Sequence, residues 1–147
     1  MKINVVLGTS AVGLAVATLL AERGEAVRLI TRRGTGPDHP MIERIAADAT
    51  DAERLSAIAD GAAVLYNCAS PAYDRWPIDW PPLNAAILTA AERSRAVLAS
   101  YSNLYGYGPG AGVMSEETPL PRRTLSCAFA RRCGATRLRS MKAGASV

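Results

Sequence analysis

Short apolar runs alternate with helical patterns along the first hundred residues of the chain. Runs rich in β-branched and aliphatic residues predict five strands, at residues 3–7, 26–31, 42–47, 63–68 and 96–102. Apolar positions three or four residues apart predict three helices, at residues 11–23, 51–59 and 83–95. Strands that are separated by helices indicate βαβ crossovers and a parallel sheet.

Local signals set the ends of these elements. Gly24 ends the first helix, and Thr50 or Asp51 caps the second. Glycines and prolines predict loops at residues 32–40 and 71–82, and the second of these loops holds both tryptophans. With right-handed crossovers, the expected fold is α/β, a doubly wound parallel sheet of five strands in the order 3-2-1-4-5.

A GxSxxG turn joins the first strand to the first helix. Gly8 permits the tight turn, and Gly13 permits close packing of the helix on the strand. Ser10 stands where a glycine usually lets a pyrophosphate approach, and we expect its hydroxyl to donate to a phosphate oxygen. In the first βαβ unit this pattern predicts a Rossmann-type NAD(P) site at the helix N-terminus, the alternative being a tight turn without a ligand. The residues expected to bind cofactor here are Gly8, Thr9, Ser10, Ala11, Val12 and Gly13.

The second predicted strand ends in Thr31 and is followed by Arg32 and Arg33. An acidic residue at this place binds the ribose hydroxyl of NAD, whereas arginine suits the 2′-phosphate of NADP. The two arginines therefore favour NADP over NAD, unless they are solvated loop residues.

Three later segments complete an ordered set with the glycine turn, and an acidic-Thr-Pro segment at 116–119 follows them. They are Ala46-Ala47-Asp48-Ala49-Thr50-Asp51, Tyr66-Asn67-Cys68-Ala69 and Ser102-Asn103-Leu104-Tyr105-Gly106-Tyr107-Gly108-Pro109. Over residues 1–121 this set resembles atypical members of the NAD-dependent epimerase/dehydratase family, within the short-chain dehydrogenase/reductase superfamily. The resemblance implies an oxidoreductase that acts on a sugar nucleotide or another small carbonyl or alcohol substrate.

The resemblance also implies roles for single residues. Asp48, with Ala49 beside it, would contact the adenine, although Asp48 could equally be a capping or loop carboxylate. Ser102 and Tyr105 are the candidate catalytic residues, although Ser102 could be a strand-end hydroxyl. The cofactor would also be lined by Asn67, Cys68 and Ala69. Two tryptophans, Trp76 and Trp80, would either wall a substrate pocket or pack their loop on the sheet.

One departure from the family affects the mechanism. These enzymes use a Tyr-x-x-x-Lys pair, in which the lysine lowers the pKa of the tyrosine for proton exchange. This chain has two lysines, Lys2 and Lys142, and neither lies four residues after a tyrosine. Some atypical members of the family lack this pair, so its absence alone does not exclude activity. We expect this chain to be inactive because of the truncation that its C-terminal tail indicates. The alternative function is a non-catalytic NAD(P)-binding redox sensor or binding module.

Charge divides the 147 residues into two predicted parts. Residues 1–121, the expected NAD(P)-binding domain, hold all 13 acidic residues and 10 of the 17 basic ones. Residues 122–147 hold six arginines, one lysine and no acid. This tail is typical of GC-rich coding read out of frame, so we expect a frameshift near residues 122–127 and a missing C-terminal part of the family fold. The alternative is a native basic tail, disordered or helical.

Composition limits the kinds of partner and compartment that we expect for this chain. The three cysteines and the one histidine lack the spacing of metal ligands, which argues against a metal site. The odd number of cysteines fits a reducing cytoplasm better than a set of disulfides. The small number of aromatic residues argues against nucleic acid as a partner of the basic tail. The apolar run at residues 3–21 is expected to be a buried strand and helix rather than a signal peptide or membrane span. An incomplete sheet edge would favour self-association.

Overall fold

The computed structural model describes residues 2–104, 107, 112–115, 117 and 118. The chain forms two separate compact units, residues 1–101 and residues 102–147, and the helices and strands described below all belong to the first. In the second unit Ser115 and Thr118 close a short turn. The amide of Ser115 donates to the hydroxyl of Thr118 (2.8 Å), and the amide of Thr118 donates to the carbonyl of Ser115 (3.1 Å).

Five parallel strands form one sheet in the order β3-β2-β1-β4-β5. The strands are β1 (Ile3–Leu7), β2 (Ala26–Thr31), β3 (Ile42–Ala46), β4 (Ala62–Asn67) and β5 (Val97–Ser100). In the centre, Val6 of β1 pairs with Leu29 of β2 on one side and with Tyr66 of β4 on the other. This order confirms the predicted doubly wound, Rossmann-type fold, in which the direction of strand succession reverses next to β1.

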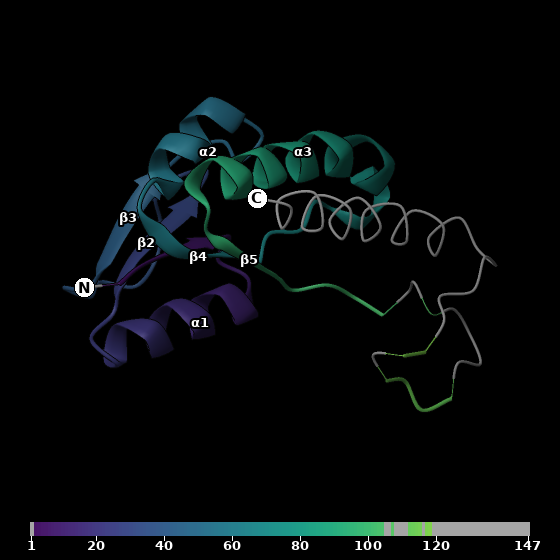
Figure 1. The fold of residues 1–147 in the computed structure, drawn as a ribbon, viewed down its shortest axis with the longest axis horizontal. Coiled ribbons are helices and arrows are strands. Elements are labelled where there is room, and N and C mark those ends of the chain that lie inside the picture. The colour runs from purple at the N-terminus through teal and green to yellow at the C-terminus, as the bar shows by residue number, and fades with distance from the viewer. Residues whose placement is uncertain (1, 105–106, 108–111, 116, 119–147) are drawn as a thin grey trace. The chain divides into compact units, whose positions relative to one another are not determined.

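Helices cover both faces of the sheet (Figure 1). Helix α1 (Ala11–Glu22) lies on one face, and helices α2 (Ala52–Ala59) and α3 (Trp76–Ser94) lie side by side on the other. A single turn of 3-10 helix, η1 (Tyr73–Arg75), leads directly into α3. Asp51 caps α2, since its carboxylate accepts from the amide of Arg54, and Gly24 follows α1 with a φ of 76°. The predicted start and stop signals of these two helices are thereby confirmed.

The core has two layers because side chains on a strand alternate between the two faces of the sheet. Towards α1, aliphatic side chains of the first three strands pack against one face of the helix. This cluster consists of Val6, Ala17, Leu20, Ala21, Val27, Leu29 and Ile42. Towards α2 and α3, the alternate strand positions Val5, Leu7, Ile30 and Leu65 are fully buried, as are Leu55 and Ile87 of the helices. The two layers hold the strands, and with them the strand ends, from both faces of the sheet.

The segment at residues 3–21 forms β1, the glycine turn and most of α1, as the buried strand-and-helix interpretation predicts. Within the described part of the chain, none of the helices has both the length and the apolar character needed to cross a bilayer.

The prediction of a loop at residues 71–82 was wrong. Helix α3 begins at Trp76 and takes in both tryptophans and three prolines, and β5 ends at Ser100 rather than at residue 102. Pro77 is accepted because the amides of a first helical turn have no intrahelical partner. Pro81 and Pro82 do interrupt the helical hydrogen bonds, and the burial of Trp80 and Leu83 against the fold outweighs that loss.

We expect Pro81→Ala to raise the free energy of unfolding by about 1–2 kcal/mol. Alanine supplies an amide for the carbonyl of Pro77, a gain of about 3 kcal/mol in a helix interior, against about 1 kcal/mol lost through a freer unfolded chain. Urea unfolding followed by circular dichroism measures the change. Pro77→Ala is the control and should bring no gain; a Pro81→Ala chain no more stable than the parent would contradict this account of α3.

Candidate functional site

A cleft of about 920 Å³ runs along the carboxyl ends of four neighbouring strands. Its lining includes Ala47 after β3, Thr31 at the end of β2, Leu7 at the end of β1 and Cys68 after β4. The cleft therefore crosses the point where the strand order reverses. In open α/β sheets this crevice is the usual place for a ligand.

The glycine turn forms the floor of the cleft, and its two glycines are required by close contacts. Gly8 has a φ of 92°, and a Cβ there would lie 2.9 Å from the Cα of Ala69. A Cβ on Gly13 would overlap the carbonyl oxygen of Gly8 and lie 3.1 Å from the Cβ of Cys68. The start of α1 can approach the ends of β1 and β4 this closely only because both positions lack a side chain.

Ser10 joins the start of α1 to the end of β4. Its hydroxyl accepts from the amide of Gly13 (3.2 Å) and donates to the carbonyl of Cys68 (3.0 Å). A hydroxyl has one proton to donate, and here the carbonyl of Cys68 receives it. In this structure Ser10 is thus the N-cap of α1 and a link to the end of β4. Its donation to a phosphate stays a prediction.

The remaining amides at the start of α1 are suited to an anion. Those of Gly13 and Leu14 are used by the side chain and the carbonyl of Ser10. Nothing in the described part of the chain accepts a hydrogen bond from the amides of Ala11 and Val12, and the first turn of α1 holds no acidic residue. The partial positive charge of the helix N-terminus is thus left uncompensated beside the cleft.

The loop after β2 brings Arg32 and Arg33 to the wall of the cleft, where both side chains are exposed. The hydroxyl of Thr31 accepts from the amide of Thr35 (2.8 Å), which bends the chain. Gly34 adopts a φ of 63° within this bend. Two guanidinium groups consequently lie at the β2 end of the cleft.

Asp48 lines the cleft after β3 and is held by Thr50. Its Oδ1 accepts from the amide (2.9 Å) and from the hydroxyl (2.8 Å) of Thr50. These hydrogen bonds, with a smaller contribution from the positive charge of Arg32, lower the pKa of Asp48. The carboxylate is therefore ionised at neutral pH and acts as an acceptor beside the two arginines.

Asn67 is buried and is not among the residues that line the cleft. Its buried carboxamide donates to the hydroxyl of Ser100 on β5 (3.0 Å) and accepts from the amide of Ala69 (3.2 Å). It thereby fixes the chain where Cys68 and Ala69 reach the cleft. Burial raises the pKa of the Cys68 thiol, so this thiol is neutral at physiological pH.

The structure brings most of the predicted cofactor residues together. Lining the cleft are Gly8, Thr9, Ser10, Arg32, Arg33, Asp48, Ala49, Cys68 and Ala69. Ala11, Val12 and Gly13 open α1 next to them. Of the two candidate catalytic residues, Ser102 is exposed in the second unit and Tyr105 lies outside the described residues. The structure thus tests neither catalytic role.

The sequence interpretation missed Arg75 and Asp79, which line the cleft from the start of α3. Their spacing of four residues is a helical signal that the surrounding prolines obscured. Neither Trp76 nor Trp80 is among the residues that line this cleft, and their role in a substrate pocket stays a prediction. The indole of Trp76 instead donates to the carbonyl of Pro71 (3.1 Å), and Trp80 is buried in the fold.

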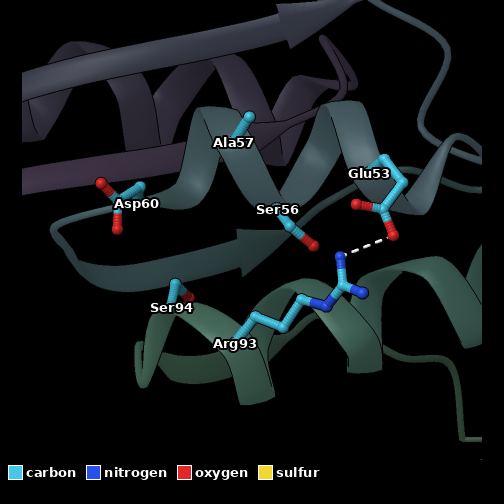
Figure 2. A pocket seen from close by; sticks show the side chains of 6 residues that line it. All are labelled: Glu53, Ser56, Ala57, Asp60, Arg93 and Ser94. Atoms are coloured by element: carbon cyan, nitrogen blue, oxygen red, sulfur yellow. Dashed lines mark hydrogen bonds and ion pairs between the residues drawn. The ribbon is translucent and has the colours of Figure 1, made fainter.

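A second, smaller hollow of about 430 Å³ lies between α2 and α3 and shares no residue with the cleft. Figure 2 shows the pair that spans it, in which Arg93 of α3 donates to Glu53 of α2 (2.6 Å). This hydrogen bond and its charge lower the pKa of Glu53. Both side chains are mostly exposed, so the hollow is a solvated seam between helices.

Comparison with known proteins gives a likeness in structure. Neither a protein-family model nor a curated protein sequence matches the chain. UDP-glucose 4-epimerase from Brucella ovis, in complex with NAD, matches with a TM-score of 0.80 and 18% identity over 99% of this chain and 49% of that one. The Bordetella bronchiseptica enzyme WbmH, in complex with NAD+, matches with a TM-score of 0.78 and 21% identity over 95% and 52% of the two chains.

A third match is a uronate dehydrogenase mutant from Agrobacterium tumefaciens, complexed with NAD, with a TM-score of 0.75 and 18% identity over 92% and 54% of the two chains. The chain shares its fold with these enzymes. It spans about half the length of each of them. The predicted resemblance to the epimerase/dehydratase family is thus confirmed at the level of the fold.

We expect Ser10→Ala to lower the free energy of unfolding by about 1 kcal/mol, because it removes the cap of α1 and the link to Cys68. Denaturant unfolding measures the loss. Ser56→Ala is the matched control, since the Ser56 hydroxyl donates only to Ala52 within its own helix, and it should change stability by less than about 0.5 kcal/mol. Equal effects of the two substitutions would refute the linking role of Ser10.

Proposed function

We propose that the chain is the NAD(P)-binding part of an oxidoreductase of the epimerase/dehydratase type. The observation that carries the proposal is the glycine turn at the strand reversal, which leaves the amides of Ala11 and Val12 beside a cleft of about 920 Å³. Backbone amides at a helix N-terminus in this position bind the diphosphate of a dinucleotide. Solved enzymes of the same fold are bound to NAD, which supports the assignment.

In this proposal the residues of the cleft divide the dinucleotide between them. The amides at the start of α1 would hold the diphosphate, while Asp48 and Ala49 would contact the adenosine half. Cys68 and Ala69 would line the nicotinamide half at the end of β4. The cofactor supplies the hydride chemistry when bound, and these residues bind and orient it.

Arg32 and Arg33 favour NADP within the same proposal. They stand where the ribose of the adenosine half is bound in this fold, and no acidic residue occupies that place directly after β2. A planar guanidinium donates two parallel hydrogen bonds to a phosphate, which the 2′-hydroxyl of NAD cannot match.

The substrate of the oxidoreductase would be a sugar nucleotide or another small carbonyl or alcohol compound. In an active enzyme of this type, the catalytic residues would stand at the positions of Ser102 and Tyr105. None of the five tyrosines has a lysine four residues later, so the usual proton-transfer pair is not encoded in this sequence. We therefore propose that this chain binds cofactor without turning it over, which would also suit a redox-sensing or binding module.

Thermal melting with and without millimolar NADPH or NADH tests the cofactor site. A ligand that binds only the folded chain at 100 times its Kd stabilises it by about 2.7 kcal/mol, so we expect the Tm to rise by several degrees, and further with NADPH. A cooperative transition that neither dinucleotide moves would exclude a working site.

The NADP preference is tested with the double variant Arg32→Ala/Arg33→Ala. We expect NADPH affinity to fall at least about tenfold and NADH affinity to stay within about twofold, because only NADPH presents the extra phosphate. Isothermal titration calorimetry measures both. The control is Arg44→Ala on β3, which removes an exposed arginine outside the cleft and should leave both affinities unchanged. Equal losses for the two dinucleotides would contradict the preference.

A further inference from the structure

Among the described residues that line the cleft there is one ion pair, and it lies at the start of α3. Arg75 donates from Nε to Oδ2 of Asp79 (2.8 Å) and from Nη2 to Oδ1 (2.9 Å), so the two planar groups meet edge to edge. Both residues line the cleft. This pair comes after β4 in the chain, whereas Arg32 and Arg33 come after β2, so the two groups of charges reach the cleft from different strand ends.

Three contacts hold Arg75 at this place. Its amide donates to the carbonyl of Ala72 (2.9 Å), which closes the turn η1. The indole of Trp76 donates to the carbonyl of Pro71 (3.1 Å), and the rings of Trp76 and Tyr73 pack with centroids 4.8 Å apart. Arg75 is thus carried by a braced turn rather than by a free loop.

Its position is unfavourable for the helix itself. Arg75 is the N-cap of α3, where its side chain makes no capping hydrogen bond and its charge adds to the positive end of the helix. Asp79 offsets that charge in part. Exposed ion pairs of this kind stabilise a fold little, so stability alone gives a weak reason for an arginine here.

The bidentate pair leaves part of the guanidinium unused. An arginine has five N–H donors, and Asp79 accepts from two of them. In the described part of the chain nothing accepts from the other three. Asp79 therefore fixes the guanidinium plane and leaves one edge of it with donors for a further acceptor.

We propose that Arg75 binds an oxyanion, a phosphate or a carboxylate, of a ligand at the β4 side of the cleft, and that Asp79 is the positioning residue. The proposal deepens the proposed function and rests on it for the orientation of the ligand. The adenosine half of the dinucleotide would lie on the β2 side, so Arg75 faces the other half. The oxyanion belongs either to the diphosphate of the cofactor or to a separately bound substrate.

Binding to Arg75→Ala distinguishes these two sources. If Arg75 contacts the cofactor diphosphate, calorimetry should show a Kd for NADH at least about tenfold higher in this variant than in the parent chain. The reason is that the substitution removes a charge-assisted hydrogen bond. If the oxyanion comes from the substrate, the Kd for NADH stays within about twofold. The matched control is Arg93→Ala, which removes an arginine that is also paired with a carboxylate but lies in the seam of Figure 2, and it should not change the Kd.

A second measurement detects the separate anion. In the ¹⁵N-arginine-labelled full chain saturated with NADH, the Nε–H signal of Arg75 is identified by its loss in Arg75→Lys. We expect millimolar inorganic phosphate or malonate to shift this signal and to leave that of Arg93 in place. Asp79→Asn should weaken the anion effect severalfold while the Tm stays unchanged, which separates positioning from a structural role.

An unchanged NADH affinity together with an unmoved Arg75 signal would overturn the proposal. Failure of the proposed function is distinguishable from this result, because then the parent chain itself would not bind NADH. The phosphate and malonate titrations of the unliganded chain would still show whether Arg75 binds an oxyanion, and an unmoved signal there would again overturn the proposal.

Discussion

The close approach of α1 to the end of β4 is the contact on which the cleft depends. Gly13 lies against the carbonyl of Gly8 and the side chain of Cys68, and Gly8 lies against the backbone of Ala69. The hydroxyl of Ser10 closes the same contact, because it accepts from the amide of Gly13 and donates to the carbonyl of Cys68. If these segments stood further apart, the amides at the start of α1 would not lie beside a cavity bounded by the strand ends, and the proposed anion site would open to bulk water.

The charges of the cleft are arranged so that each carboxylate already has a partner. Asp48 is satisfied by Thr50, and Asp79 is satisfied by Arg75, which leaves the helix N-terminus and the exposed arginines as the positive groups that a ligand meets. In a protein whose acids and bases were paired at random, an anionic ligand would have to displace internal partners first. Here the positive groups lie along one crevice, as a negatively charged molecule with several anionic groups requires.

The sequence predicted the sheet well because each strand and turn is specified locally. The bounds of β1 and β2 agree with the prediction, and Gly24 and Asp51 mark helix ends by their own backbone and side-chain chemistry. It failed where long-range contacts outweigh local preference. Pro77, Pro81 and Pro82 predict a loop, yet the packing of Trp80 and Leu83 makes this segment helical. Because the helix was not predicted, the ion pair of Arg75 at its start was not predicted either. Likewise, the partner of the Ser10 hydroxyl is 58 residues away, and no local pattern indicates it.

The prolines of α3 also determine how water meets the start of this helix, next to the cleft. Because Pro81 and Pro82 have no amide hydrogen, the carbonyls of Pro77 and Ile78 lack the donor that the fourth residue along normally gives. A bare carbonyl must be hydrated or must accept from something else, and Ile78 is 66% exposed. The first turns of α3 therefore present polar backbone carbonyls between apolar side chains. A molecule that closes over them has to bring hydroxyl or amide donors of its own, or trap water beneath it.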